Sequence, residues 1–386
     1  MNEVHNLLIG YELNKKGSQI AYFDRETGQP VSVPAKVGTG MYVFPTTLCK
    51  IQGKDVWHFG IEADYFSAQR GGIPVEHFFD CLENEEPLLI DGVYREPYEL
   101  LAIYLKSSLA LLGGRDVVKA ITCLAITTEK LSAALSSNIK KACKAMGLES
   151  DRLVLQDAMQ SFYSYAYSQK NDMKARDIAL FVFDEDSVSY HGLSANKNTR
   201  PALIHPEQRE AVTLSPIENQ RDEDFYAYAY AVLEKRIFSS VYITGEGFDT
   251  AWAKKSVPYL CKSGRHVFQG QNLYVRGACY GAYDKAESRH LREQLYLGED
   301  LILTNVGMEM LVKGSPSYVP LIQAGINYFD SDREIELITG SEDELTFVIA
   351  GMDGRGRKQM KMVLTELPKR PAGATRLAVN VHCSDA

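Results

Sequence analysis

The chain has 386 residues, of which 45% are apolar and 24% charged, and its formal net charge is −8. The length favours two or three domains, and the composition is typical of a soluble globular protein. The acidic balance and the lack of a Lys/Arg block argue against a general nucleic-acid-binding protein. No apolar run approaches the roughly 20 residues of a membrane-spanning helix, so we expect no membrane role.

The cysteines and the N-terminus indicate the compartment. Seven cysteines are irregularly spaced, and the closest two, Cys261 and Cys279, are 18 residues apart, without CxxC or metal-type spacing. This usage fits a reducing environment. The first residues lack a basic segment followed by an apolar one, so no secretory signal is expected. We therefore predict a cytoplasmic protein.

The chain opens with a predicted β-hairpin, IGYELNKKGSQIAYFD, at 9–24. Two short strands flank a turn of Asn14, Lys15, Lys16 and Gly17. Two interpretations of the cationic turn are open: the lysines bind phosphate as point charges, or they form a solvated turn.

The first half continues with alternating elements. Gly113-Gly114 and Gly147 are the expected stops of two of its helices. The sequence predicts strands at 41–51, 55–63, 118–126 and 152–156, an acidic loop at 82–87, and helices at 97–112, at 129–146 and from 157 onward.

The second half partly repeats this order. Strands at 177–184, 188–194 and 241–245 surround a helix at 222–238, and two more helical stretches follow. Alternation at this spacing predicts an α/β fold, and the repeat predicts two similar lobes around a cleft. We place lobe I at about 1–175 and lobe II at about 176–297.

The last part, 298–386, changes character. Period-two strands are predicted at 334–338, 345–350, 360–364 and 377–381, separated by polar turns, with no helix. The sequence therefore predicts a separate small all-β domain. The segment at 300–303 is either a linker or its first strand.

The order of these segments resembles the seventy-kilodalton heat-shock chaperone family, as a divergent bacterial-type member. The similar segments include 118–168, VYITGEGF at 241–248 and NLYVRGACYGA at 272–282. The tail matches from VGMEML through Leu364-Thr365-Glu366-Leu367-Pro368 to LAVNV. The resemblance implies two actin-like (ribonuclease H-like) lobes around an ATP or ADP site with Mg²⁺, followed by a truncated peptide-binding β domain.

The resemblance also assigns the phosphate hairpins, where this chain departs from the family. Glu12 stands where the family has Asp, and Asn14, Lys15 and Lys16 replace Gly-Thr-Thr. Asp184 matches a family Asp, but Glu185, Asp186 and Ser187 replace the Gly-rich run. A carboxylate about 5 Å from a phosphate charge costs roughly 3 kcal/mol at a dielectric near 20. Asp184 and Asp186 either hold Mg²⁺ or are solvated in the turn.

The remaining nucleotide-site positions match singly. Asp157 stands for a family Glu or is a plain helix N-cap. Gly245, Glu246 and Gly247 correspond to the adenosine element, and Gly277 to a Gly-Ala pair that also suits close helix packing. Arg70 lies where the catalytic Lys belongs, in a dissimilar context. No set of nucleophile, base and orienting residue can be assembled.

In the tail, the resemblance points to a peptide groove lined by apolar residues. The same residues also suit the core of a small sandwich, and the family's last strands and helical lid have no counterpart here. These groove candidates are Met310, Leu311, Val312, Tyr318, Val319 and Leu321.

Three functions remain open. The leading hypothesis is a chaperone-like protein with a degenerate nucleotide cleft that acts by binding protein or peptide partners. The second is an active Mg-dependent ATPase using Glu12, Asp157 and Asp184, and the third is an actin-like assembly protein. The sequence leaves the oligomeric state open.

Overall fold

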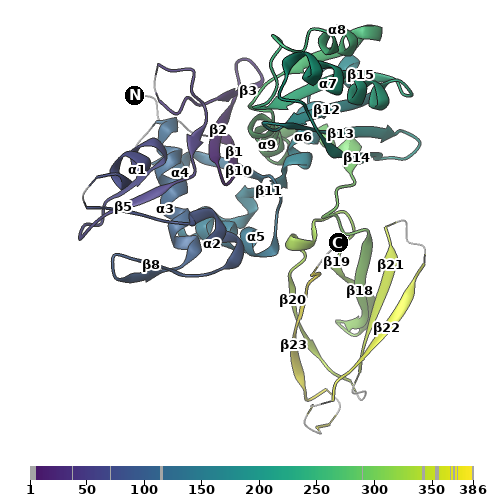
Figure 1. Cartoon of the computed structure of the whole chain (residues 1–386). Coiled ribbons are helices and arrows are strands. Elements are labelled where there is room, and N and C mark those ends of the chain that lie inside the picture. The colour runs from purple at the N-terminus through teal and green to yellow at the C-terminus, as the bar shows by residue number, and fades with distance from the viewer. Residues whose placement is uncertain are drawn as a thin grey trace. The chain divides into compact units, whose positions relative to one another are not determined.

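The computed structural model describes residues 6–384, except 37, 70, 114–115, 289, 341–343, 353–355, 366, 368–369 and 372. Arg70, Gly114, Glu366 and Pro368, which the sequence analysis singled out, lie outside the described residues. The chain divides into two compact units, one ending at Tyr296 and one beginning at Leu297. The fold is mixed α/β, with several sheets (Figure 1).

The first sheet of the N-terminal unit has the strand order β11-β10-β1-β2-β3, and β4 pairs with β2. β1, β10 and β11 are parallel, whereas β1, β2 and β3 are antiparallel neighbours. The strands are β1 (Leu7–Leu13), β2 (Gly17–Asp24), β3 (Gln29–Ser32), β4 (Phe44–Pro45), β10 (Ile121–Thr128) and β11 (Leu153–Asp157).

The second sheet repeats this connectivity. Its order is β16-β15-β12-β13-β14-β17, so its first five strands in chain order occupy the same relative places as β1, β2, β3, β10 and β11. β12 and β15 are parallel, and β12, β13 and β14 are antiparallel. The strands are β12 (Asp177–Phe183), β13 (Ser187–Asn196), β14 (Ala202–Thr213), β15 (Phe238–Gly245), β16 (His266–Gln269) and β17 (Gln294–Tyr296).

Two helices exchange places between these sheets. α6 (Ala158–Tyr167) follows the last strand of the first sheet, yet its Phe162 and Ala166 pack with Ile178 and Leu180 of the second. α9 (Leu273–Tyr283) follows the second sheet but packs on the first, where Ala278 joins the cluster around Leu8 and Cys123. The packing therefore does not follow the expected division of the sequence near residue 175.

Local sequence explains the helix boundaries in the first half. α3 (Pro97–Leu109) begins with Pro97, whose missing N–H is not needed in a first turn, and Glu96 and Glu99 form a capping box. α5 (Ala133–Ala145) begins after Ser132, whose hydroxyl accepts the Leu135 N–H. The smaller elements here are β5 (Leu48–Ile51), β6 (Trp57–Phe59), α1 (Gly60–Ser67), β7 (Gly72–Pro74), α2 (Phe78–Asn84), β8 (Leu88–Ile90), β9 (Val93–Arg95) and α4 (Val117–Ala120).

The structure differs from the sequence predictions in several places. Residues 60–63 and 118–120, expected in strands, lie in α1 and α4, and residues 82–84, expected in a loop, end α2. The long strand β14 was not expected. The predicted helix at 222–238 is α7 (Glu218–Leu233), and the two later helices are α8 (Ser256–Leu260) and α9. Among the described residues, no helix has the length and apolar character needed to cross a membrane.

The C-terminal unit is built from two small sheets. One has the order β19-β18-β21-β22, and the other pairs β20 with β23. Met308, Leu321, Leu345 and Phe347 form the core of the unit. The strands are β18 (Thr304–Val312), β19 (Ser315–Ile322), β20 (Arg333–Ile338), β21 (Glu344–Gly351), β22 (Lys358–Val363) and β23 (Arg376–Val381). Within 300–303, Leu301 forms an isolated bridge with Asn327.

Candidate functional site

The β1–β2 turn is tied to its surroundings by its own residues. The Asn14 N–H donates to the Gly17 carbonyl at 3.2 Å. Lys15 Nζ lies 2.5 Å from Asp80 Oδ1 of α2, although the Lys15 side chain is 66% exposed. Lys16 is exposed. Lys15 thus forms a surface ion pair with Asp80 of the same chain.

Both polar atoms of the Asn14 side-chain amide form hydrogen bonds within the protein. Its Nδ2 donates to Glu12 Oε1 at 2.9 Å, and its Oδ1 accepts the Glu129 N–H at 2.9 Å. The Asn14 carbonyl accepts from Thr46 Oγ1 at 2.6 Å. A ligand phosphate would have to displace these bonds to use Asn14.

Glu12 is the buried acid of this site, with only 7% of its surface exposed. It ends the parallel run of β1 beside Thr127 of β10, and it lies at the N-terminus of α9, where the Val275 N–H donates to its carboxylate. Burial raises the pKa of the Glu12 carboxyl to about 7, against the lowering effect of the bonds from Val275 and Asn14. Glu12 therefore titrates near neutral pH.

Tyr274 lies near three acidic side chains, those of Glu12, Glu129 and Asp157. Burial raises the pKa of Tyr274, and the charges of Glu12, Glu129 and Asp157 raise it further. Asp157 caps α6, since its Oδ1 accepts the Gln160 N–H at 2.6 Å. Uncompensated carboxylates repel phosphate, so this corner is electrostatically poor for a nucleotide. Within the described part of the chain, no group of three or more His, Cys, Asp or Glu has a geometry suited to a metal ion.

The second hairpin, between β12 and β13, closes on itself. The Asp184 N–H donates to the Ser187 carbonyl at 3.0 Å, and Asp184 Oδ1 accepts the Glu185 N–H at 3.0 Å. The Asp186 carbonyl accepts the Leu214 N–H at 2.7 Å. The Asp184 carboxylate thus forms a local turn bond.

Arg221 of α7 fills the space beside this hairpin. Its Nη2 donates to the Glu185 carbonyl at 2.6 Å and to the Gly247 carbonyl at 3.2 Å, and its guanidinium lies 5.3 Å from the Trp252 ring centroid. A Cβ on Gly247 would lie 2.0 Å from the Asp184 carbonyl oxygen. The loop carrying Glu246 therefore packs directly against the hairpin, with an arginine between their carbonyls.

Gly245 needs glycine for two reasons. Its φ is +98°, and an added Cβ would lie 1.8 Å from the Phe183 carbonyl oxygen. Gly277 needs it for helix packing, since a Cβ there would lie 1.9 Å from the Ser161 carbonyl oxygen of α6. These contacts account for both glycines by backbone packing.

A chain of glutamine hydrogen bonds joins the two strand ends. The Gln271 amide accepts the Gly245 N–H at 3.0 Å and donates to the Gly245 carbonyl at 2.6 Å. Gln19 Nε2 donates to the Gln271 carbonyl at 3.1 Å and lies 3.4 Å from Glu12 Oε2. Glu12 of the first sheet is thereby linked to Gly245 of the second.

The sequence analysis missed Gln19, Arg221, Gln271 and Tyr274. Only Gln19 carries a local signal, because it is a buried polar residue inside the apolar strand β2. The roles of the other three depend on contacts between segments far apart in the sequence.

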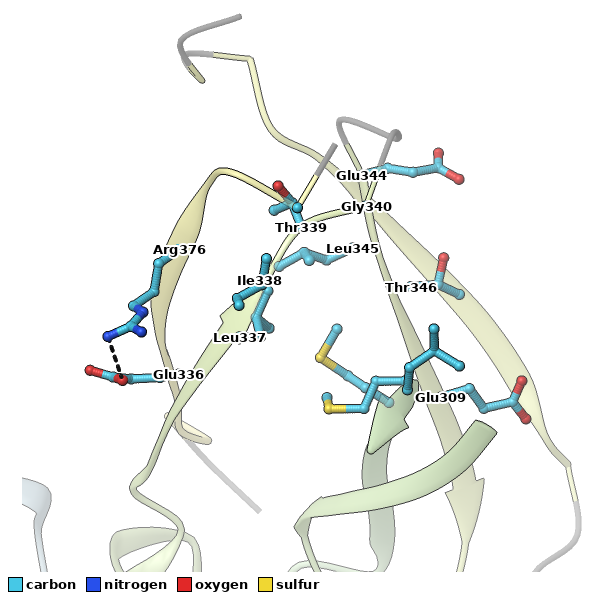
Figure 2. A pocket seen from close by; sticks show the side chains of 14 residues that line it. Glu309, Glu336, Leu337, Ile338, Thr339, Gly340, Glu344, Leu345, Thr346 and Arg376 are labelled. Carbon is cyan, nitrogen blue, oxygen red and sulfur yellow. Dashed lines mark ion pairs between the residues drawn. The ribbon is translucent and has the colours of Figure 1, made fainter. Parts of the chain in front are cut away.

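The C-terminal unit contains a cavity of about 770 Å³ between its sheets. Met310 and Leu311, two of the predicted groove residues, line it. Figure 2 shows the side chain of Leu345 pointing toward Leu337 and Ile338 across the cavity, while Glu309 and Thr346 point away. The other groove candidates, Val312, Tyr318, Val319 and Leu321, lie on β18 and β19 and do not contribute to its lining.

Two family models match the chain, and each covers most of one compact unit. A model described as "Family of unknown function (DUF5716) C-terminal" matches residues 29–299, more than half of the chain. A model described as "Domain of unknown function (DUF8552)" matches residues 301–386. No match was found among curated proteins.

Proposed function

We infer a function for this chain, which belongs to the DUF5716 family of unknown function, from the contacts at its two strand ends and in its β unit. We propose that it is a chaperone-like protein with two actin-like lobes and a degenerate nucleotide cleft, and that it acts by binding protein or peptide partners. The resemblance to the seventy-kilodalton heat-shock chaperones is part of this proposal.

The repeated connectivity supports the actin-like part. Both sheets have an antiparallel three-strand meander, and beyond its first strand the sheet continues with two strands parallel to that strand. Two copies of this arrangement in one unit are what the resemblance to actin-like lobes leads one to expect. The β unit after Leu297 agrees with the expected order of domains.

One observation supports a degenerate nucleotide cleft: the protein's own side chains already pair with the Asn14 amide, the Lys15 ammonium and the Val275 N–H at the start of α9. A helix N-terminus is a natural anion site, and here the Glu12 carboxylate already accepts the Val275 N–H. At the second hairpin, Arg221 is held by two backbone carbonyls. A triphosphate would have to displace both arrangements.

Calorimetry with Mg-ATP and Mg-ADP on the full chain, paired with thermal shift at millimolar nucleotide, tests this proposal. A ligand at a hundred times its Kd adds about 2.7 kcal/mol of stability, which a thermal shift detects. We expect no heat of binding and no shift. Mg-dependent ATP turnover that Asp184→Asn abolishes and Asp186→Asn leaves intact would overturn the proposal in favour of an active ATPase.

Partner binding by the β unit needs its own experiment. The cavity and its apolar lining, including Met308, Met310 and Leu345, support binding of an apolar segment. We expect some extended peptides on a cellulose-bound peptide array to retain the purified full chain. An array on which no peptide retains the protein would contradict this part of the proposal. A shift to large species in sedimentation on adding nucleotide would favour an assembly protein instead.

A further inference from the structure

Strand β22 is an edge of its sheet, and no other described strand pairs with its outer side. It pairs with β21 on one side and ends the sheet order β19-β18-β21-β22 (Figure 1). All of its residues, 358–363, are exposed. An edge strand presents N–H and C=O groups that can pair with another chain.

The side chains of β22 that face the core layer are left uncovered. Met360 pairs with the buried Phe347, and Met362 with the buried Leu345, so both methionines lie on the core face of the sheet. They are nevertheless 48% and 47% exposed. In the described part of the chain, the opposing layer contains only β20 and β23, and neither methionine belongs to the core cluster.

The two edges of this sheet differ in chemistry. At the opposite edge, β19 carries Pro316 and Pro320, which lack the N–H needed for pairing. β22 has no proline. Prolines on an edge are one means of blocking the addition of a further strand. Only one of the two edges is therefore protected in this way.

The charge of β22 selects the kind of strand that can join it. The strand carries Lys358 and Lys361 and no acid, in a chain of net charge −8. Lys361 is on the outer face and pairs with Glu344. Lys358 is on the core face with the two methionines, and no ion pair is found for it among the described residues. A second β22 would bring like charges together, whereas an acidic strand would not.

We propose that β22 is the docking edge for an extended segment of a partner protein that joins the sheet as an added strand. Its side chains on the core face would be apolar opposite Met360 and Met362 and acidic opposite Lys358. Main-chain hydrogen bonds supply affinity in this mode, and alternate side chains supply specificity. This inference rests on the proposed function and adds to it which side chains the bound segment of the partner would carry.

Fluorescence anisotropy with labelled eight-residue peptides and the full chain tests the docking edge. Three peptides share apolar residues at alternate positions and differ at one end position, which is Glu, Gln or Lys. Two further versions of the Glu peptide carry N-methyl groups on one or the other alternate set of amides. We expect the Glu peptide to bind best, and only one N-methylated version to lose binding, because a pairing strand directs alternate amides toward its neighbour.

Matched variants locate the site. Lys358→Gln should weaken the Glu peptide about two- to fivefold, the size of a cross-strand charge pair. Lys361→Gln removes the same charge from the same strand, but on the outer face, and should leave binding unchanged. Met360→Gln should weaken all three peptides about fivefold or more by removing apolar contact.

The outcomes separate the inference from the proposed function. Peptides that bind equally to Met360→Gln but are lost in Met310→Gln would overturn the docking edge and leave partner binding through the cavity intact. A Lys peptide binding as well as the Glu peptide would also overturn it. Failure of every peptide, here and on the array, would count against the proposed function itself.

Discussion

The two sheets of the N-terminal unit share one strand order, but side chains of different chemistry hold the ends of their first strands. At the end of β1, the buried Glu12 carboxyl accepts hydrogen bonds from the Asn14 amide and the Val275 N–H. After β12, a guanidinium, Arg221, donates to the carbonyls of Glu185 and Gly247. Connectivity fixes where each turn lies, and single side chains from elsewhere in the chain determine its electrostatics.

This difference bears on the proposed loss of nucleotide binding. A phosphate held between the two sheets would need donors from both. Glu12 already accepts hydrogen bonds at the end of β1, and Arg221 already donates to the carbonyls of Glu185 and Gly247. Four substitutions test this comparison.

The largest effect is expected at the helix pair that joins the sheets. Gly277→Ala places a Cβ 1.9 Å from the Ser161 carbonyl oxygen, so α6 and α9 must separate. We expect a loss of at least about 3 kcal/mol in the free energy of unfolding. Gly40→Ala, where no atom lies within 4 Å of the added Cβ, is the control. Equal stability of the two variants in chemical denaturation would show that the helices do not pack this closely.

The buried Glu12 should make the stability of the protein depend on pH. The pKa of Glu12 rises from 4.5 to about 7 in the folded protein. As pH rises from about 4.5 to 7, the unfolded chain releases this proton while the folded chain retains it. The free energy of unfolding should therefore fall by about 3 kcal/mol over this range and stay level above it.

Glu12→Gln should remove this fall, because an amide does not titrate. Urea denaturation at pH 5 and pH 8 measures the difference in the free energy of unfolding between the two pH values. Glu26→Gln, in the exposed turn after β2, controls for the loss of one carboxylate. An unchanged difference between the two pH values in Glu12→Gln would place the titrating group elsewhere.

Loss of Arg221 should act locally, on the β12–β13 turn and the loop at 245–248. Arg221→Met keeps much of the side-chain volume but loses both carbonyl bonds, and we expect a loss of about 1 to 2 kcal/mol. Hydrogen exchange should accelerate at 184–187 and 245–248. The control is Arg209→Met, because Arg209 also lies over an aromatic ring, that of Tyr190, but its hydrogen bond goes to the Ala231 carbonyl and not to either loop. Exchange that stays slow in Arg221→Met would mean that the loops hold each other without the arginine.

The smallest effect is expected at the link between the turns. Gln271→Leu removes two exposed hydrogen bonds to Gly245 and should cost about 0.5 to 1 kcal/mol. Gln269→Leu, at an exposed position of β16, is the matched control. A loss as large as that of Arg221→Met would indicate that the link, rather than each turn separately, holds this region together.

Much of the fold was predictable because its central strands are continuous apolar runs. DIALFVF and VYITG were predicted as strands, and β12 and β15 contain them. β14 was not predicted, because it carries Pro206, Glu207 and Arg209 and is largely exposed. Pairing with β13 positions this strand, and the local sequence pattern does not predict that pairing.

The site was predictable in position but not in chemistry. Glu12, Asp157 and Gly245 were singled out, and they lie at strand ends. The burial that shifts the pKa of Glu12 comes from α9, which lies more than 250 residues later in the sequence. Arg221 sits in a helix of unremarkable polarity, and only the approach of two loops gives it a role. Whether the site binds nucleotide stays a prediction.

The exchange of α6 and α9 between the sheets has a consequence during protein synthesis. The strands of the first sheet are complete at Asp157, but the helix that packs on Leu8 and Cys123 ends only at Tyr283. At about 5 to 20 residues per second, the ribosome needs roughly 6 to 25 seconds to add the intervening residues. For that time Leu8 and Cys123 lack the α9 residues that pack on them in the folded chain, and we expect a ribosome-associated holdase to bind the nascent sheet there.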